Sequence, residues 1–209
     1  MNNTVKEILE WIYCILIALV LALLFRYFIL TPTVVKQRSM FPTLKENQRL
    51  ILSRTFRITG LDLERGDVVT FEAPSDVYLT SEVNQNNPIA QYNNNSKSIF
   101  SKFVYYTLEL TKKSYIKRVI ALEGEHVKIE DGKVYINGEE LDEEYLQDDV
   151  VTTSDVFYDF IVPKGYVFCM GDNRANSKDC RDLGCIPLEK IEGIVTFRFW
   201  PFDVWGKID

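Results

Sequence analysis

The sequence predicts a mainly β domain preceded by a single N-terminal transmembrane helix. Residues 8–25 are almost uninterruptedly apolar and, with residues 27–30, are long enough to cross a bilayer core, which takes about 20 helical residues. Beyond them, short stretches rich in Val, Ile and Tyr are separated by turn residues. Such a series of short strands is typical of β domains.

The apolar segment is interpreted as an uncleaved membrane anchor that comprises residues 1–30. A cleavable targeting sequence is the main alternative, but no small-x-small site follows and the apolar run is long for that class. A buried helix of a soluble protein is disfavoured because no polar residues mark a solvent face. Lys and Arg are more numerous after the segment than before it, which favours a cytoplasmic domain. Because long domains translocate largely regardless of such charges, the count does not settle the orientation.

The remaining residues, 31–209, are predicted to form one β domain. Thr31-Pro32-Thr33 ends the helix. Asp131-Gly132 indicates a hairpin turn, and Asn137-Gly138 marks another turn. The predicted strands are 49–53, 67–73, 115–122, 126–130, 133–137, 157–162, 166–170 and 191–200.

Residues 75–113 are predicted to be a variable insertion in this domain. Its centre, 81–98, is polar and Asn-rich, which is typical of a surface loop. Residues 99–113 are predicted to include a short helix. We interpret the insertion as a structural loop and not as a chemical site.

Charge and cysteine usage exclude several classes of protein. The net charge is −6, all of it on residues 31–209, which argues against nucleic acid as a partner. The four cysteines form no CxxC or Cys/His spacing, so no metal site is indicated. Free cysteines that pack as small apolar residues are favoured over a disulfide between Cys180 and Cys185.

The single histidine restricts the possible catalytic chemistry. His126 would have to be the base of any Ser–His–Asp or Cys–His site, and no GxSxG motif accompanies it. We interpret His126 as an ordinary surface residue. Zinc hydrolysis and phosphate-loop chemistry are disfavoured because their usual ligands and glycines are missing. A serine activated by a lysine then remains, or a function without catalysis.

Ser39 and Lys117 are the candidates for such a pair. Ser39 lies just beyond the anchor, near Pro42, whose ring fixes one backbone angle. Lys117 lies in a mostly apolar strand, where an inward orientation lowers its pKa and leaves a neutral amine that accepts a hydroxyl proton. Strand alternation then places Arg118 on the opposite, outward face.

Four short segments beyond the anchor stand out by their composition and their order along the chain. They are Ser-Met-Phe-Pro-Thr-Leu at 39–44, Arg-Gly-Asp-Val-Val-Thr-Phe at 65–71, Lys-Arg-Val-Ile-Ala-Leu-Glu-Gly at 117–124 and Gly-Asp-Asn-Arg-Ala-Asn-Ser-Lys-Asp-Cys-Arg at 171–181. Each is weak alone, but four in order behind an anchor are specific. The chain therefore resembles bacterial type I signal peptidases over the anchor, residues 33–73 and residues 114–200. The Asn-rich insertion is outside this resemblance.

The resemblance implies a membrane-bound serine endopeptidase that cleaves N-terminal signal peptides from exported preproteins with a Ser/Lys dyad. Ser39 would be the nucleophile, Lys117 the general base and Ser177 the hydroxyl that orients the lysine. Asp179 and Arg181 would form a supporting ion pair. Residues 172–174 are interpreted as a structured turn, and no metal or organic cofactor is implied. The family's substrates carry small side chains at the first and third positions before the cut.

Four positions depart from the family's usual pattern. Gln37 and Arg38 replace the more usual small or polar pair before the serine. We predict that Gln37 occupies part of the oxyanion hole, through its backbone or its amide, beside the Ser39 N–H. Ala121 stands where Gly is common, and Cys180 replaces a common Ser and is expected only to pack.

The expected partners are preproteins bearing signal peptides and the lipid bilayer, with no nucleic acid. The expected location is the cell membrane, crossed once, with the catalytic domain on the extracytoplasmic side. A catalytically silent relative that assists pilus assembly is one alternative, but such relatives lack the Ser or the Lys, and both are present here. A self-cleaving Ser/Lys repressor conflicts with the anchor and with the absence of a DNA-binding segment.

Overall fold

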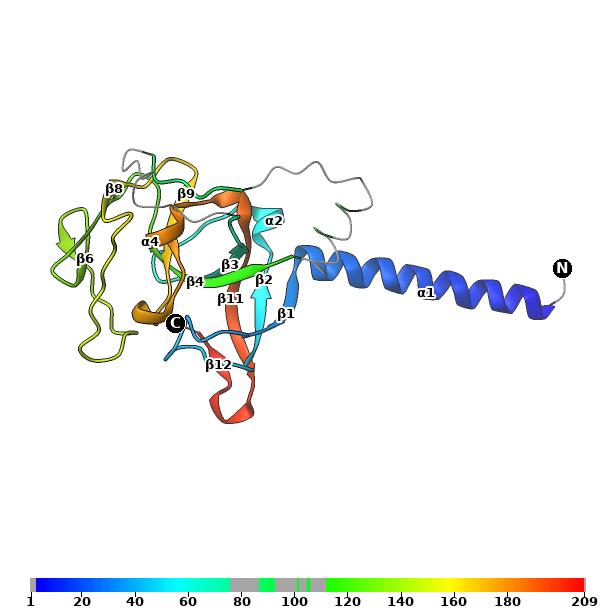
Figure 1. The fold of residues 1–209 in the computed structure, drawn as a ribbon. Coiled ribbons are helices and arrows are strands. Elements are labelled where there is room, and N and C mark those ends of the chain that lie inside the picture. The colour runs from blue at the N-terminus through cyan, green and yellow to red at the C-terminus, as the bar shows by residue number, and fades with distance from the viewer. Residues whose placement is uncertain (1–2, 76–86, 93–100, 102–104, 106–111, 209) are drawn as a thin grey trace.

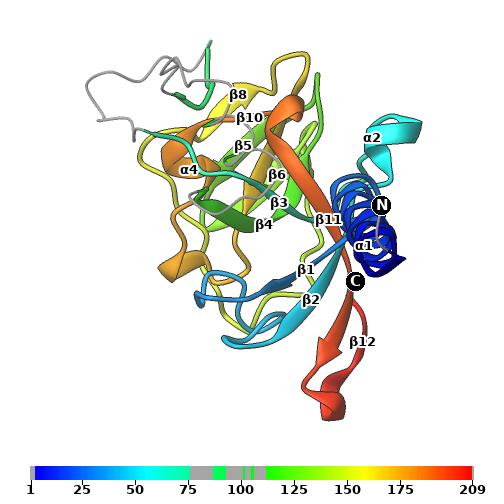
Figure 2. The same cartoon turned by 90° about the vertical axis from the view of Figure 1, so that its right-hand side faces the viewer.

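The computed structural model of the protein describes residues 3–75, 87–92, 101, 105 and 112–208. A long N-terminal helix, α1 (Asn3–Phe28), leads into a body of β strands (Figure 1). The predicted fold class, mainly β with one N-terminal apolar helix, is confirmed. The helix extends away from the body, and the strands gather at its C-terminal end (Figures 1 and 2).

Helix α1 has the length and composition of a membrane-spanning segment. Residues Thr4–Phe28 have a mean hydropathy of 2.7, and 0% of their most apolar stretch is buried by the rest of the chain. Only Ile29 separates α1 from the first strand, β1 (Leu30–Val34). Hydrogen bonds from Thr31 Oγ1 to the Arg26 carbonyl and from Arg57 Nη1 to the Tyr27 carbonyl, both 2.8 Å, tie the helix end to the body.

The larger sheet has eight strands in the order β1-β2-β11-β3-β4-β9-β10, with β12 paired to β11. Besides β1, its strands are β2 (Arg49–Ser53), β3 (Val68–Glu72), β4 (Ser114–Ala121), β9 (Tyr166–Met170), β10 (Ile186–Pro187), β11 (Ile191–Trp200) and β12 (Gly206–Lys207). Each step from β1 to β4 joins antiparallel neighbours. Because four such steps separate β1 from β4, these two strands run in the same direction.

The smaller sheet has four strands in the order β7-β6-β5-β8 and lies at the end of the body opposite α1 (Figure 1). Its strands are β5 (His126–Glu130), β6 (Lys133–Ile136), β7 (Glu139–Glu140) and β8 (Asp159–Ile161). Asp131 and Gly132 have φ angles of 51° and 82°, as a two-residue type I′ turn requires. The predicted hairpin turn is therefore confirmed.

Two apolar clusters hold the strands together. The larger cluster joins both sheets and includes Phe71, Val119 and Phe168. The smaller cluster joins β2, β3 and β11 and includes Met40 and Leu44, which are 1% and 0% exposed. Because Met40 and Leu44 follow Ser39 closely in sequence, their burial fixes the segment that carries this serine.

The strand predictions agree closely with the structure, although four strands were missed. β2, β5, β9 and β11 have the predicted bounds, and the other predicted strands shift by a few residues. β1 was missed because Pro32 indicated a break in the helix. Proline is tolerated in β1 because this strand lies at the edge of the sheet, where a backbone donor is dispensable. The short β7, β10 and β12 were also missed.

The insertion is partly integrated into the body. Ile89 forms a parallel bridge with Cys185, and Ala90 is only 7% exposed. The predicted surface loop is therefore wrong for residues 87–92, whereas the rest of the tract 81–98 lies outside the described residues. The predicted helix within residues 99–113 also lies almost entirely outside them.

Short helices complete the body. They are α2 (Phe56–Thr59), α4 (Cys180–Leu183) and the 3-10 turns η3 (Arg174–Asn176), η4 (Leu188–Lys190) and η5 (Phe202–Val204). Cys169, Cys180 and Cys185 are buried and free, so the favoured interpretation of these cysteines is confirmed.

Candidate active site

Ser39 lies in a tight segment between β1 and β2. The Phe41 N–H donates to the Arg38 carbonyl at 3.0 Å, which turns the backbone at Ser39. From the other side, the Asn173 N–H donates to the Ser39 carbonyl at 3.0 Å. Asn173 Nδ2 also donates to the Arg38 carbonyl at 3.1 Å. Two segments far apart in sequence thus fix the serine backbone.

Lys117 on β4 brings its amine to this serine. Its Nζ lies 2.7 Å from Ser39 Oγ and donates to the Ile116 carbonyl at 3.0 Å. Lys117 is 1% exposed. Burial lowers the pKa of the Lys117 amine from 10.5 to about 8, and the negative charge of Asp179 opposes this lowering. About a tenth of the amine is therefore neutral at pH 7.

Ser177 lies near the pair without a hydrogen bond to Lys117. Its Oγ is buried and has no hydrogen-bond partner among the described residues. The contact that we expected between Ser177 and the lysine amine is not formed in this structure, so the orienting role of Ser177 remains a prediction.

Gly171 stands where the backbone of Ser39 and the side chain of Ser177 come together. A Cβ added at Gly171 would lie 2.2 Å from Ser177 Oγ and 2.3 Å from the Ser39 carbonyl oxygen. Real Cβ contacts are never this short, so any larger residue must displace the Ser39 backbone. Glycine is thus required here by the close approach of two segments.

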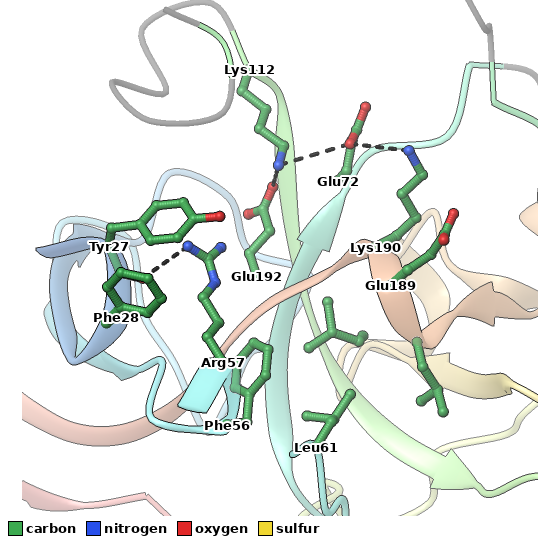
Figure 3. Close-up of a pocket in the computed structure, with 12 residues that line it drawn as sticks. Tyr27, Phe28, Phe56, Arg57, Leu61, Glu72, Lys112, Glu189, Lys190 and Glu192 are labelled. Atoms are coloured by element: carbon green, nitrogen blue, oxygen red, sulfur yellow. Dashed lines mark hydrogen bonds and ion pairs between the residues drawn. The ribbon is translucent and has the colours of Figure 1, made fainter. Parts of the chain in front are cut away.

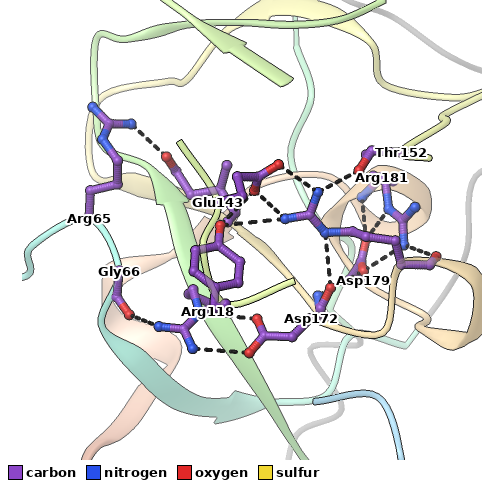
Figure 4. Close-up of polar contacts among 12 residues, drawn as sticks. Arg65, Gly66, Arg118, Glu143, Thr152, Asp172, Asp179 and Arg181 are labelled. Atoms are coloured by element: carbon purple, nitrogen blue, oxygen red, sulfur yellow. Dashed lines mark hydrogen bonds and ion pairs between the residues drawn. The ribbon is translucent and has the colours of Figure 1, made fainter. Parts of the chain in front are cut away.

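The predicted ion pair between Asp179 and Arg181 is present. Arg181 Nε and Nη2 donate to the two Asp179 oxygens at 2.9 and 3.0 Å, and Asp179 is 0% exposed. The same carboxylate accepts the Gly171 N–H at 3.0 Å. The pair therefore holds the segment that contacts Ser39 (Figure 4).

Arg118 is buried, which corrects the prediction that it points outward. Its Nε and Nη2 donate to the two oxygens of Asp172, both at 3.0 Å, and the residue is 2% exposed. Nη1 donates to the Gly66 carbonyl at 2.8 Å, and the guanidinium lies 4.1 Å from the centre of the Tyr145 ring (Figure 4). The prediction was wrong because both faces of β4 are covered by protein.

Residues 172–174 form a structured turn, as interpreted, and buried charges hold it in place. Arg174 is 3% exposed and pairs with Glu143, while its Nε donates to the Gly171 carbonyl at 3.1 Å. Asp172 also accepts a hydrogen bond from Thr43 Oγ1 at 2.6 Å. These buried charges link β4, the serine segment and the loop after β7. A sequence signal for them exists, since a strand with apolar residues on both faces leaves Arg118 no solvent face.

A groove of about 550 Å³ opens at the serine. Residues of β1 line one side, and residues 112–116 at the start of β4 line the other. Gln37 is exposed and lines the groove beside Ser39. Neither the Gln37 amide nor the Ser39 N–H bonds another described residue, so both are available to a ligand.

A second cavity of about 570 Å³ lies at the end of α1 and contains neither Ser39 nor Lys117. Aromatic side chains of α1 and α2 line it, together with an ion-pair cluster around Lys112 (Figure 3). Lys112 and Glu192 also line the groove, so their ion pair separates the two spaces.

His126 is remote from this chemistry. Its Nε2 lies 2.7 Å from Asp159 Oδ1 on the smaller sheet, with both side chains partly exposed. His126 does not line the groove. Among the described residues, no cluster of His, Cys, Asp and Glu is arranged to hold a metal ion.

Comparison with known proteins gives consistent matches. A family model described as signal peptidase, peptidase S26, matches residues 8–200. Signal peptidase IB of Staphylococcus aureus (strain COL) is 34% identical, covering 94% of this chain and 92% of its own. Signal peptidase I S of Bacillus subtilis (strain 168) is 35% identical, covering 97% and 94%. A solved signal peptidase I from Enterococcus faecalis V583 aligns with 65% of this chain and 98% of its own, at 25% identity and a TM-score of 0.42.

Proposed function

Because this chain belongs to the signal peptidase family, peptidase S26, whose members are serine endopeptidases that cleave signal peptides from preproteins, we propose that it does so with Ser39 as nucleophile and Lys117 as general base. The observation that carries this proposal is the 2.7 Å separation of Lys117 Nζ and Ser39 Oγ. A buried amine with a lowered pKa suits the role, since a general base works best when its pKa lies near the working pH.

The reaction begins when the Ser39 hydroxyl donates its proton to the neutral Lys117 amine. Ser39 Oγ attacks the carbonyl carbon of the scissile peptide bond, and a tetrahedral intermediate forms. Protonated Lys117 then gives the proton to the leaving amine of the mature protein, which leaves an ester on Ser39. The lysine, neutral again, activates a water molecule that hydrolyses this ester and releases the signal peptide.

The oxyanion of the intermediate requires donors on the groove side of Ser39. We assign this role to the Ser39 N–H and to Gln37, because both face the groove without another described hydrogen-bond partner. We also assign to Ser177 the role of orienting the amine, through a hydrogen bond that its buried hydroxyl would form to Lys117 during the reaction. The Asp179–Arg181 pair holds Gly171 against the Ser39 backbone.

The substrate segment lies in the groove as an added strand. β1 is an edge strand, and β9 pairs with β4 only from Arg118 onward, so within the described part of the chain one edge of residues 114–117 has no strand partner. An extended peptide between these two edges completes hydrogen bonds with both. A chain that enters from α1 and proceeds toward Ser39 runs parallel to both strands.

Helix α1 anchors the enzyme, with residues 1–30 in the bilayer and residues 31–209 as the catalytic domain on the extracytoplasmic side. The anchor raises the effective concentration of the site for membrane-inserted preproteins. The partners are then signal-peptide-bearing preproteins and the lipid bilayer.

Cleavage of a model preprotein by the full-length protein in detergent tests this function. Wild type should release the mature protein, and Ser39→Ala should release none above background. Ser53→Ala is the matched control, because Ser53 does not line the groove and its hydroxyl bonds Thr55. Cleavage by folded Ser39→Ala at the wild-type rate would remove Ser39 from the mechanism.

A further inference from the structure

The peptide unit between Arg38 and Ser39 has one polar group on each side of the serine segment. Its carbonyl oxygen belongs to Arg38 and its N–H to Ser39, and the bond is trans. The two groups of a planar trans peptide point in opposite directions. Asn173 Nδ2 donates to this carbonyl at 3.1 Å, and Ser39 lines the groove whereas Arg38 and Asn173 do not. The carbonyl therefore faces away from the groove, and the Ser39 N–H faces into it.

Asn173 holds the peptide units on both sides of Ser39. Its side-chain amide bonds the Arg38 carbonyl, and its backbone N–H donates to the Ser39 carbonyl at 3.0 Å. The Phe41 N–H also donates to the Arg38 carbonyl at 3.0 Å, but Phe41 belongs to the serine segment and moves with it. The amide of Asn173 thus fixes the Arg38–Ser39 peptide from outside that segment. A hydrogen bond to the carbonyl also polarises the peptide and makes its N–H a stronger donor.

The neighbours of Asn173 in sequence hold it in place from both sides. Asp172 pairs with Arg118, and Arg174 pairs with Glu143 (Figure 4). Asp172 and Arg174 are 2% and 3% exposed, whereas Asn173 between them is only partly buried. Two buried ion pairs thus fix a residue whose own side chain is not part of the core. This arrangement indicates that the pairs serve to aim the amide of Asn173.

We propose that Asn173 is a positioning residue for the oxyanion hole: its side-chain amide holds the Arg38–Ser39 peptide so that the Ser39 N–H points at the oxyanion. The proposal rests on the function proposed above and adds to its oxyanion hole a residue that does not line the groove. A donor that is already aligned needs no reorganisation when the negative charge develops. The benefit arises only in the transition state, so it raises kcat and leaves the binding of unreacted substrate unchanged.

Asn173→Ala and Asn173→Asp test this role in cleavage of a model preprotein by the full-length protein in detergent. Alanine removes the amide, and aspartate keeps its size but offers no donor to the Arg38 carbonyl when ionised. Both variants keep the backbone N–H. Each should lower kcat roughly 10- to 100-fold and leave KM within about threefold of wild type, because the Ser39 N–H remains but is less well aligned. Wild-type kcat in both variants would overturn the proposal.

A pair of inhibitors distinguishes alignment of the donor from a purely structural role. A peptide aldehyde adds the Ser39 hydroxyl to its carbonyl group, and the former carbonyl oxygen then lies where the oxyanion forms. The matching peptide alcohol binds the same groove without reacting. Both Asn173 variants should bind the aldehyde roughly 10- to 100-fold more weakly than wild type does and the alcohol equally well. Equal losses for the two compounds would show that Asn173 only maintains the fold, and would overturn the proposal.

Asn176→Ala is the matched control, because Asn176 is exposed and ends the same turn, η3. Its backbone N–H donates to the Asn173 carbonyl at 2.9 Å, and alanine retains this bond. Asn176→Ala should keep the wild-type kcat and the wild-type affinity for the aldehyde. Losses as large as those of Asn173→Ala would assign the effect to the turn as a whole and overturn the proposal.

The Ser39→Ala variant separates this proposal from the proposed function. If Ser39→Ala is inactive while both Asn173 variants match wild type, only the role of Asn173 fails. If Ser39→Ala cleaves the preprotein at the wild-type rate, the proposed function itself fails.

Discussion

The two faces of β4 place a buried cation in two different environments. Lys117 and Arg118 are neighbours in sequence, and they are 1% and 2% exposed. On one face, Lys117 contacts a hydroxyl and a carbonyl, Ser39 Oγ and the Ile116 carbonyl oxygen. On the other face, Arg118 is bound by both oxygens of Asp172.

This difference shows that the side chain and its partner together decide the chemistry of a buried cation. Without a bonded carboxylate, burial lowers the lysine pKa to about 8 and produces an amine that can take up a proton. The bidentate bonds between the Arg118 guanidinium and Asp172 instead fix segments of the chain in place. One strand thus carries a reactive cation and a structural one.

Among the changes that test this comparison, Lys117→Arg should have the largest effect on activity. It places a permanently charged group on the face of β4 that carries the reactive lysine. Guanidinium does not lose its proton in a protein, so no base remains for Ser39. We expect kcat/KM to fall by roughly 10³-fold or more, measured as preprotein cleavage.

His126→Ala is the control for this variant, since His126 is the one other conventional base and lies on the smaller sheet. It should keep near wild-type activity. A folded Lys117→Arg protein with normal turnover, or a folded His126→Ala protein with none, would contradict the assignment of Lys117 as base.

Asp172→Asn tests the structural role of Arg118 on the other face of β4. It removes the charge that compensates Arg118 and leaves a buried guanidinium unpaired, which typically costs about 3–5 kcal/mol. Urea unfolding should show this loss. Asp159→Asn, which removes a partly exposed partner of His126, should cost about 1 kcal/mol or less. Similar losses for both variants would show that the Arg118 pair contributes no more than a surface contact.

Lys117→Met should increase stability while it abolishes activity. In the unfolded chain the lysine pKa is 10.5, and in the folded protein it is about 8, so the unfolded state binds more protons between these values. The free energy of unfolding of wild type should therefore rise as pH increases from 8 to 10.5. Below pH 8 the buried lysine costs about 3 kcal/mol, which Lys117→Met should recover. A variant no more stable than wild type at pH 7 would mean that burial costs the lysine little.

The pH dependence of cleavage should show the smallest effect. Because only the neutral amine accepts the serine proton, kcat/KM should rise about tenfold per pH unit below pH 8 and level off above it. A profile that levels off near pH 6.5 would point to histidine as the base and contradict the comparison between the two faces.

Much of the fold follows from local sequence patterns. Apolar alternation and turn residues predict β2, β5, β9 and β11 with their observed bounds. The length of the apolar run predicts α1. The candidate pair Ser39 and Lys117 also follows from sequence, because the lone histidine leaves few other bases and the family resemblance selects this serine and this lysine.

The missed features depend on tertiary packing. Alternation predicts which residues share a face of β4, and it was applied to Arg118 without the second signal, the apolar residues on both faces of this strand. The buried role of Arg174 depends on Glu143, a partner distant in sequence that no local pattern identifies. The hydrogen bond expected from Ser177 failed for a similar reason, since hydroxyl orientation is set by the assembled site.

Because a single residue joins α1 to β1, the helix and the β body rotate together as one rigid unit. A helix of 26 residues is about 39 Å long, whereas a bilayer hydrocarbon core is about 30 Å thick. With α1 in the bilayer, as proposed, it tilts to match, and it stands more upright where the membrane is thicker. A linker of one residue, Ile29, is too short to let the helix rotate without the body. The hydrogen bonds from Thr31 and Arg57 to the carbonyls of the last helical turn also resist such a rotation. Membrane thickness therefore sets the height and inclination of the groove above the lipid surface.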